Sequence, residues 1–370
     1  MIRSAVWNTT RLARPGALAL SAAACAYLGA FEPRGPTVLM VAPVVALGWS
    51  NTRFDRIGVS VMAHLAIWSP LPSMATAYGV SPVEAWVGIS VVMLSQAVIV
   101  GLLPPVLGVA LWALSPFGFG HPVFGIFSVM PFSTLGAVES LIASALILVG
   151  LAIPQALAFG LIGLIALGAI GFVSTDAPTP SALVPVSTSF AERSMFPSDD
   201  WAQIGKKLES VEGLNPQLLP EGTIGQDADR GFEFFSDLAR TGGHDLYVGV
   251  SSEDGEKIVG FFKDGHVATI YRQVQGVPVI NDELAMPWHF FGGEPALIDG
   301  ERVVFTICFE AFLPLTWVRA LVTDSTTVVV VANDRWSPPS VRNAQAKLLS
   351  FPWPASTLAA VNFPETTSND

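Results

Sequence analysis

The chain has 370 residues, a positive mean hydropathy and a formal net charge of −11 at pH 7. Its charge is uneven, because residues 1–177 carry 6 Lys+Arg and 5 Asp+Glu, whereas residues 178–370 carry 13 and 25. This division indicates a membrane region followed by a soluble acidic domain, and an acidic domain without a basic stripe argues against nucleic-acid binding.

Apolar segments recur through residues 1–174 and predict a transmembrane domain of six or seven helices. A helix needs ~20 apolar residues to cross a bilayer, so the second and fifth segments are short for a span. The segments are Pro15–Phe31, Pro36–Ser50, Ile57–Tyr78, Val83–Leu103, Pro104–Phe117, Ser133–Leu151 and Pro154–Val173.

Basic residues before the first segment and after the second predict a cytoplasmic amino terminus. They are Arg3, Arg11, Arg14, Arg53 and Arg56, and after Arg56 no Lys or Arg occurs before Arg193. An odd number of spans would place the soluble domain outside the cytoplasm. A signal peptide over residues 1–31 is the competing interpretation, but the several apolar segments that follow favour an uncleaved first helix.

A Pro-rich linker over residues 175–182 is the predicted boundary of the soluble domain, residues 183–370. Alternating and helical patterns predict an α+β domain with an αββα layering, and the last roughly 20 residues are expected to be poorly ordered or peripheral. The expected strands are 182–186, 218–219, 245–251, 257–262, 266–274, 303–308 and 326–332, and the expected helices are 201–211, 231–239 and 315–322.

A cysteine and a glutamate each follow an expected strand. Cys308 ends the run 303–307, and Glu221 comes after the apolar run 216–219. A thiol can attack an amide or ester carbonyl while a carboxylate takes its proton and returns it to the leaving group. Considered alone, Cys308 fits a buried structural cysteine equally well. The only other cysteine, Cys25, lies in the first apolar segment, so a disulfide is not expected.

No metal or other cofactor is predicted. The five histidines are scattered without ligand spacing, and no phosphate-binding Gly-Lys-Ser/Thr loop occurs.

Four short motifs occur in an order that resembles the carbon–nitrogen hydrolase (nitrilase) superfamily. The apolar first half makes the chain similar to its membrane branch, typified by apolipoprotein N-acyltransferase, and more narrowly to the TraB family of plasmid conjugal transfer proteins. The motifs are Pro220–Ile224, Tyr271–Pro278, Ile307–Glu310 and Ala332–Trp336.

The resemblance implies that Glu221 is the general base, that Cys308 forms a thioester, and that Gln273 occupies the position of a lysine that stabilises the tetrahedral intermediate. It also implies binding or supporting roles for Glu310, Asn333, Asp334 and Trp336. No other cation is expected at the site, because strand alternation points Arg272 to the opposite face and Lys263 lies in an expected turn.

Two functions remain open on this resemblance. The first is a membrane N-acyltransferase or amide-processing enzyme that takes an acyl group from a phospholipid or amide and gives it to an amine, a protein or water. The second is a catalytically weak or inactive scaffold, favoured by the uncharged Gln273, that binds a pilin, a lipid or a secretion component of the conjugation machinery. In both, the expected location is a bacterial inner membrane with the soluble domain in the periplasm.

Overall fold

The computed structural model describes about three fifths of the chain in detail, and all statements below refer to this part. The described residues are 2–32, 34, 39, 42–77, 79–105, 107–108, 111, 183–188, 198–209, 216–225, 227–251, 257–273, 294–312, 316, 319–320, 322–334, 337–349 and 356–362.

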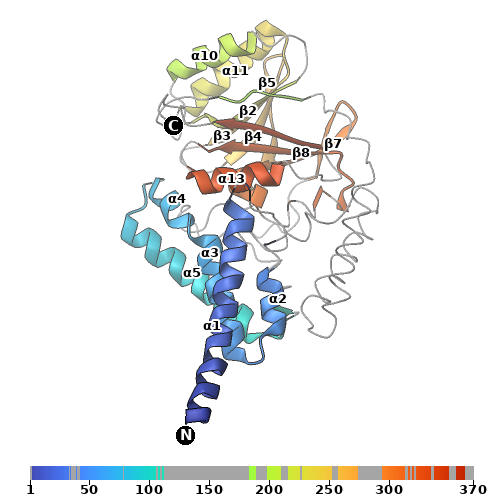
Figure 1. The fold of residues 1–370 in the computed structure, drawn as a ribbon. Coiled ribbons are helices and arrows are strands. Elements are labelled where there is room, and N and C mark those ends of the chain that lie inside the picture. Colours follow the sequence, from blue (N-terminus) through green and yellow to red (C-terminus); the bar gives the residue numbers. More distant parts are fainter. Residues whose placement is uncertain are drawn as a thin grey trace. The chain divides into compact units, whose positions relative to one another are not determined.

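The chain forms two compact units (Figure 1). The helical unit contains residues 1–176, 312–314 and 338–354, and the α+β unit contains residues 177–311, 315–337 and 355–370. The helices of the first unit are α1 (Ile2–Phe31), α2 (Ala42–Trp49), α3 (Arg53–Trp68), α4 (Leu71–Ala77), α5 (Pro82–Leu102) and α13 (Pro339–Leu349).

Of the apolar segments, the fourth forms a helix close to its predicted bounds. Within the described residues, α5 is the one helix with the length and apolar composition to cross a membrane, and Gly16–Phe31 is a shorter apolar stretch. The expectation of one continuous helix over Ile57–Tyr78 is wrong, because the chain there divides into α3 and α4 at residues 69–70. The described residues of the second segment include the eight-residue helix α2. Residues 112–182, which hold the sixth and seventh predicted spans, lie outside the described part.

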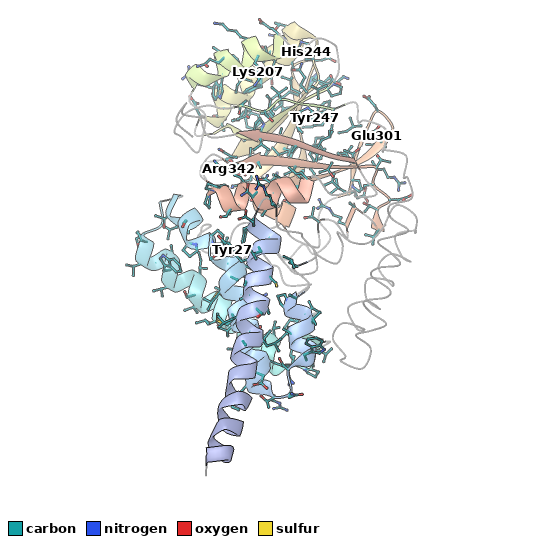
Figure 2. All side chains as sticks on the ribbon, viewed as in Figure 1. Tyr27, Lys207, His244, Tyr247, Glu301 and Arg342 are labelled. Atoms are coloured by element: carbon teal, nitrogen blue, oxygen red, sulfur yellow. The ribbon has the colours of Figure 1, made fainter. Side chains whose placement is uncertain are left out.

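Helix α13 belongs to the helical unit although it follows the strands in sequence. The Asn343 side-chain amide donates a hydrogen bond to the Phe31 carbonyl at the end of α1, over 3.2 Å. Figure 2 labels Arg342 of α13 and Tyr27 of α1. The Tyr27 ring lies 5.2 Å from that of Phe31, in the last turn of the same helix. The helical unit is therefore completed by a segment of the predicted soluble domain.

Two sheets form the α+β unit. The first has the order β1-β2-β3-β4-β5, with β1–β3 parallel and β3–β5 antiparallel, and the second has the order β6-β7-β8-β9, with β7–β9 parallel. The strands are β1 (Val184–Pro185), β2 (Gln217–Ile224), β3 (Leu246–Ser251), β4 (Lys257–Lys263), β5 (His266–Arg272), β6 (Ala296–Ile298), β7 (Glu301–Ile307), β8 (Thr327–Asn333) and β9 (Ser356–Asn362).

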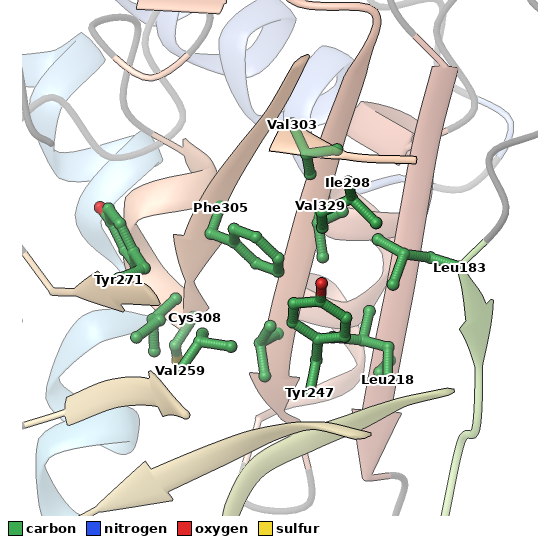
Figure 3. Close-up of a cluster of buried hydrophobic side chains, with 13 residues drawn as sticks. Leu183, Leu218, Tyr247, Val259, Tyr271, Ile298, Val303, Phe305, Cys308 and Val329 are labelled. Atoms are coloured by element: carbon green, nitrogen blue, oxygen red, sulfur yellow. The ribbon is translucent and has the colours of Figure 1, made fainter. Parts of the chain in front are cut away.

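The two sheets pack face to face through one apolar cluster. Leu218, Tyr247 and Val259 of the first sheet meet residues such as Phe305 and Val329 of the second (Figure 3). The rings of Tyr247 and Phe305 stack at 5.8 Å between centroids. Because every residue of β8 is buried, this strand lies in the interior of the unit, as its continuous valine run predicts.

The opposite face of the first sheet is covered by α10 (Ser198–Glu209) and α11 (Ala228–Gly242). Trp201 and Ile204 of α10 and Phe235 of α11 form a second apolar cluster with Leu219 and Val248 of the sheet. The predicted α+β layering of helices on a double sheet is present on this side. Half of the residues of the expected helix over 315–322 lie outside the described part.

The expectation of a peripheral carboxyl-terminal tail is wrong for residues 356–362. They form β9, which pairs in parallel with β8 from Thr327–Ser356 to Asn333–Asn362. The Pro, Ser and Thr content of the tail conceals the short run Leu358–Val361, whose Ala360 and Val361 are buried.

Candidate active site

Glu221 is presented by an irregularity in β2. The parallel pairing of β2 with β3 changes register between Leu219 and Ile224, and Gly222 inside this bulge has φ +77°. The Thr223 hydroxyl donates to the Pro220 carbonyl over 2.8 Å and closes the turn. A left-handed backbone suits glycine because a Cβ would clash there. The expected strand end after Leu219 is therefore a bulge that projects Glu221 from the middle of a longer strand.

Gly249 of β3 makes room for this bulge. A Cβ at Gly249 would lie 2.4 Å from the Pro220 carbonyl oxygen and 2.6 Å from the Glu221 Cα, far inside contact distance. Both neighbours are backbone atoms, so neither can move aside as a flexible side chain would. The close approach of β2 and β3 at Glu221 therefore requires glycine at this position.

Cys308 stands at the end of β7, where the strand passes into the 3₁₀ turn Cys308–Phe312. Its backbone has φ +52°, in the left-handed region that non-glycine residues rarely adopt. Such a conformation costs of order 1–3 kcal/mol and persists only where surrounding contacts hold it. Figure 3 shows Cys308 beside Val259 of β4 and Tyr271 of β5, at one edge of the core between the sheets.

Glu310 holds the turn that carries Cys308. One oxygen of its buried carboxylate, Oε2, accepts hydrogen bonds from the Ile307 backbone N–H and from the Tyr271 hydroxyl, each over 2.9 Å. The Arg319 guanidinium lies 5.2 Å from the centre of the Tyr271 ring and donates to the Phe305 carbonyl. This network holds the end of β7 in place, so the role of Glu310 is to position the turn that carries the Cys308 sulfur.

Lys257, the first residue of β4, supplies a positive charge to the site. Its ammonium forms an ion pair and hydrogen bond with Glu221 Oε1, and both side chains are largely buried. The other carboxylate oxygen, Oε2, is buried without an N–H or O–H partner among the described residues. The sequence-based expectation that no ammonium stands near the thiol is therefore wrong.

The buried Cys308 thiol lies within reach of the charge of the buried Glu221 carboxylate. Burial and the Glu221 charge raise the pKa of Cys308 well above its ordinary value, the Lys257 charge acts in the opposite direction, and Asp334 adds to the rise. In the resting protein the thiol therefore keeps its proton at neutral pH. The adjacent carboxylate is placed to remove this proton when the sulfur attacks.

Gln273 follows β5 and points to the same side as Tyr271. Its Nε2 donates to the Ile307 carbonyl over 3.2 Å, and its backbone N–H donates to the Lys257 carbonyl over 2.8 Å. The neighbouring Arg272 is exposed, as strand alternation predicts. Lys263 ends β4 and pairs with Asp245 over 2.8 Å, away from the thiol.

Asn333 and Asp334 lie at the end of β8, the strand next to β7. Both are buried, and the Asp334 charge acts on Cys308. The Asp334 carbonyl accepts from the Ser337 backbone N–H over 2.9 Å, which turns the chain towards α13. Trp336 lies outside the described residues. The structure thus brings Glu221, Cys308, Gln273, Glu310 and Asp334 to one buried edge between the sheets, together with Lys257.

No family model matches the chain, and no curated protein matches it. Solved structures similar to it include a mutant of the Nesterenkonia AN1 amidase from the nitrilase superfamily, with a TM-score of 0.35 at 15% identity over 49% of this chain and 74% of the amidase. Another mutant of that amidase, with the acetamide moiety of fluoroacetamide added covalently at the active site cysteine, has a TM-score of 0.35 at 15% identity over 51% and 79%. A carbon–nitrogen hydrolase from Helicobacter pylori G27 has a TM-score of 0.28 at 17% identity over 37% and 53%.

Proposed function

We propose that the chain is an amide-processing or acyl-transferring enzyme of the carbon–nitrogen hydrolase type, which works through a thioester on Cys308. The observation that carries the proposal is the placement of the buried Cys308 thiol and the buried Glu221–Lys257 ion pair at one edge between two sheets, where both charges act on the sulfur. Two backbone irregularities, φ +52° at Cys308 and the β2 bulge at Glu221, hold these groups in place. Strained backbone at a nucleophile is typical of a functional site.

The reaction follows from these two groups. Glu221 takes the thiol proton as the Cys308 sulfur attacks the carbonyl carbon, and the carbonyl π electrons move to oxygen. The tetrahedral intermediate collapses when the bond to the leaving amine breaks and Glu221 returns the proton to that amine. Water or an acceptor amine then attacks the thioester carbonyl, again losing a proton to Glu221, and the sulfur leaves with that proton as the regenerated thiol.

The direct test is to trap the thioester on the full-length protein in detergent. The protein is mixed with p-nitrophenyl acetate or with propionamide, quenched in acid, and measured by intact-mass and peptide mass spectrometry. We expect an acyl adduct on the peptide containing Cys308, lost on treatment with hydroxylamine. The Cys308→Ser variant should form no thioester, and Glu221→Gln should slow its formation by a factor on the order of 10²–10⁴.

Cys25 provides the matched control, since it is the only other thiol. The Cys25→Ser variant should acylate at the wild-type rate. A folded wild-type protein that acylates neither cysteine with either donor would refute the proposed chemistry, and acylation confined to Cys25 would refute the assignment of the nucleophile.

The inactive-scaffold alternative rested on the uncharged Gln273. Lys257 removes that ground, because an ammonium is paired with Glu221 beside the thiol. We therefore favour an active enzyme over a scaffold. In cells of a conjugating strain, mating efficiency of a Cys308→Ala variant compared with a full deletion separates the two. An active enzyme predicts equal loss, whereas full transfer by the variant at normal protein levels would favour the scaffold.

We further propose that the helical unit anchors this enzyme in a bilayer. Along α5 the side chains of Val83, Trp86 and Val91 are 71%, 56% and 59% exposed, which forms an apolar stripe. The buried side of α5 carries small residues such as Ala97 and Gly101. This distribution is typical of transmembrane helices, where small residues pack together and apolar ones face lipid. Alkaline carbonate should leave the protein in the membrane fraction, and release by carbonate alone would contradict an integral anchor.

An acyl donor from the bilayer is the narrower form of the proposal. Vesicles of phosphatidylethanolamine with an isotopically labelled acyl chain would then transfer that chain to Cys308. Transfer from vesicles supports an N-acyltransferase with an amine acceptor, and acylation by propionamide alone supports an amidase. The role in plasmid conjugation, the inner-membrane location and the periplasmic side remain proposals from the sequence resemblance.

A further inference from the structure

Lys257 and Gln273 are cross-strand neighbours in the β4–β5 hairpin. Ile258 pairs with Arg272, and the Gln273 backbone N–H donates to the Lys257 carbonyl over 2.8 Å, which continues the ladder by one pair. Directly opposed residues on antiparallel strands place their side chains on the same face, with Cβ atoms ~5 Å apart. That face is the interior, since Val259 and Tyr271, two residues along each strand, belong to the core between the sheets.

The two side chains make different contacts on this shared face. Lys257 pairs with Glu221, and its charge acts on Cys308. Gln273 donates to the carbonyl of Ile307, the residue before Cys308. Burial alone lowers the pKa of Lys257, but the charges of Glu221, Cys308 and Glu310 outweigh it and leave this pKa raised. The amine therefore stays protonated at neutral pH.

We propose that Lys257 is the catalytic cation of this site, supplied from β4 to the oxyanion of the tetrahedral intermediate, while Gln273 is a positioning residue that holds the end of β7. The inference rests on the proposed function and adds the residue that stabilises the developing charge. A fixed ammonium at a buried site contributes more to an oxyanion than a neutral amide does, because little solvent screens it. Within the described residues, Lys263 and Arg272 lie elsewhere on the hairpin and do not compete for this position.

The hairpin geometry allows a reciprocal exchange as the test. Lys257→Met removes the cation, Gln273→Lys adds one on the opposite strand, and the double variant Lys257→Met/Gln273→Lys moves the charge across the pair. Lys263→Met is the matched control, since it removes an ion-paired lysine from the exposed end of the same strand. All variants are made in the full chain with Cys25→Ser and are checked for wild-type circular dichroism.

The first readout is the rate of Cys308 acylation by p-nitrophenyl acetate. We expect a loss on the order of 10²–10³ in Lys257→Met and no change in Lys263→Met. The double variant should recover at least tenfold over Lys257→Met, because the charge returns to the same face. Acylation of Lys257→Met at the wild-type rate would refute the catalytic role of Lys257 while leaving the thioester chemistry in place.

The second readout does not depend on catalysis. Alkylation of Cys308 by iodoacetamide between pH 7 and 10.5 follows the fraction of thiolate. The charged groups that act on the sulfur are Glu221, Lys257 and Asp334. The turn that carries it also contacts Glu310, Tyr271 and Arg319. Removing the Lys257 charge should move the alkylation profile to higher pH, and removing the Glu221 charge with Glu221→Gln should move it to lower pH. If Lys257→Met folds but leaves the profile unchanged, Lys257 does not act on the thiol, even in a protein that fails to acylate.

Lys257→Met leaves Glu221 without its partner, so misfolding is a real outcome of that single variant. Lys257→Arg keeps the charge but displaces it, and it serves as the second variant. We expect Lys257→Arg to retain the wild-type alkylation profile more closely than the acylation rate, because charge is preserved while oxyanion geometry is not. Equal and small effects on both readouts would reduce Lys257 to a structural partner of Glu221 and overturn the inference.

Discussion

Strand β4 carries a lysine at each end, and each lysine is paired with a carboxylate. At one end Lys257 and Glu221 have side chains 13% and 4% exposed, whereas at the other Lys263 and Asp245 are 53% and 28% exposed. Both pairs join a lysine ammonium to a carboxylate, of glutamate in the first and of aspartate in the second, but their surroundings differ. The buried pair lies beside the Cys308 thiol, and the exposed pair lies beside solvent and the turn at Asp264.

The difference shows how position in a sheet decides the use of an ion pair. Water screens the exposed pair, so its contribution to stability is small. The buried pair is held out of water, where its charges act strongly on one another and on any group that changes charge beside them. The same kind of ion pair is therefore a surface contact at one end of the strand and part of the proposed catalytic site at the other.

The largest effect predicted from this comparison is on stability. Lys257→Met should cost about 3 to 5 kcal/mol, because it leaves the Glu221 carboxylate buried without a counter-charge. Lys263→Met should leave the melting temperature of the full chain in detergent close to wild type. Thermal unfolding followed by circular dichroism checks both.

The double variant Lys257→Met/Glu221→Gln tests the cause of this loss. Removing both charges should recover much of the stability, since no unpaired ion is then buried. A double variant as unstable as Lys257→Met would show that packing, not charge, accounts for the cost. Equal melting temperatures for Lys257→Met and Lys263→Met would remove the distinction between the two ends of β4.

A medium effect is expected at Gly249, which lets β3 approach the Glu221 bulge. Gly249→Ala should destabilise the chain by roughly 1–3 kcal/mol through overpacking against the Pro220 carbonyl and the Glu221 backbone. It should also slow Cys308 acylation, since it displaces the general base. Gly205→Ala on α10 is the control, because its Cβ would meet nothing closer than 3.8 Å and alanine favours a helix. Unchanged acylation in Gly249→Ala would show that the bulge tolerates displacement.

The sequence predicts the layered α+β arrangement and the strands that carry Glu221, Cys308, Asn333 and Asp334. The strands before Cys308 and Asp334 are predicted because their apolar runs are long and local, as in the valines of β8. The two-residue run 218–219 gives only part of β2 and not the bulge at Glu221. Strand β9 is missed because the Pro, Ser and Thr content around it conceals the short run Leu358–Val361, and the pairing with β8, not the local composition, makes it a strand.

Lys257 is missed for a different reason. Counting back from the turn pair Lys263–His266 without interruption would place Lys257 opposite Arg272. The ladder instead changes register between Val259 and Gly260, so that Ile258 opposes Arg272 and Lys257 opposes Gln273. A β-bulge of one residue is not visible in the hydrophobic pattern, yet it decides which polar side chains meet. The shift decides that Gln273, and not Arg272, stands opposite Lys257.

The smallest effect predicted is the pH dependence of stability at the buried end. Burial and Glu221 raise the pKa of Cys308 in the folded chain, whereas an unfolded cysteine titrates near about 8.5. Between that value and the folded pKa the unfolded chain releases a proton that the native chain keeps, so stability falls as pH rises, by up to about 1.4 kcal/mol per pH unit.

The Cys308→Ala variant has no titrating thiol at this position in either the folded or the unfolded chain. As the pH rises from 8.5 to 10, its melting temperature should therefore fall less than that of the wild type. The Lys257 contribution is still complete in that interval, because its pKa is raised in the folded chain and its stabilisation is lost only above the unfolded value of about 10.4. Melting curves at four pH values for wild type, Cys308→Ala and Lys263→Met separate the two ends of β4. Parallel curves for all three would mean that the thiol titrates alike in the folded and unfolded chains, and the buried end would then lack the low-polarity surroundings on which its chemistry depends.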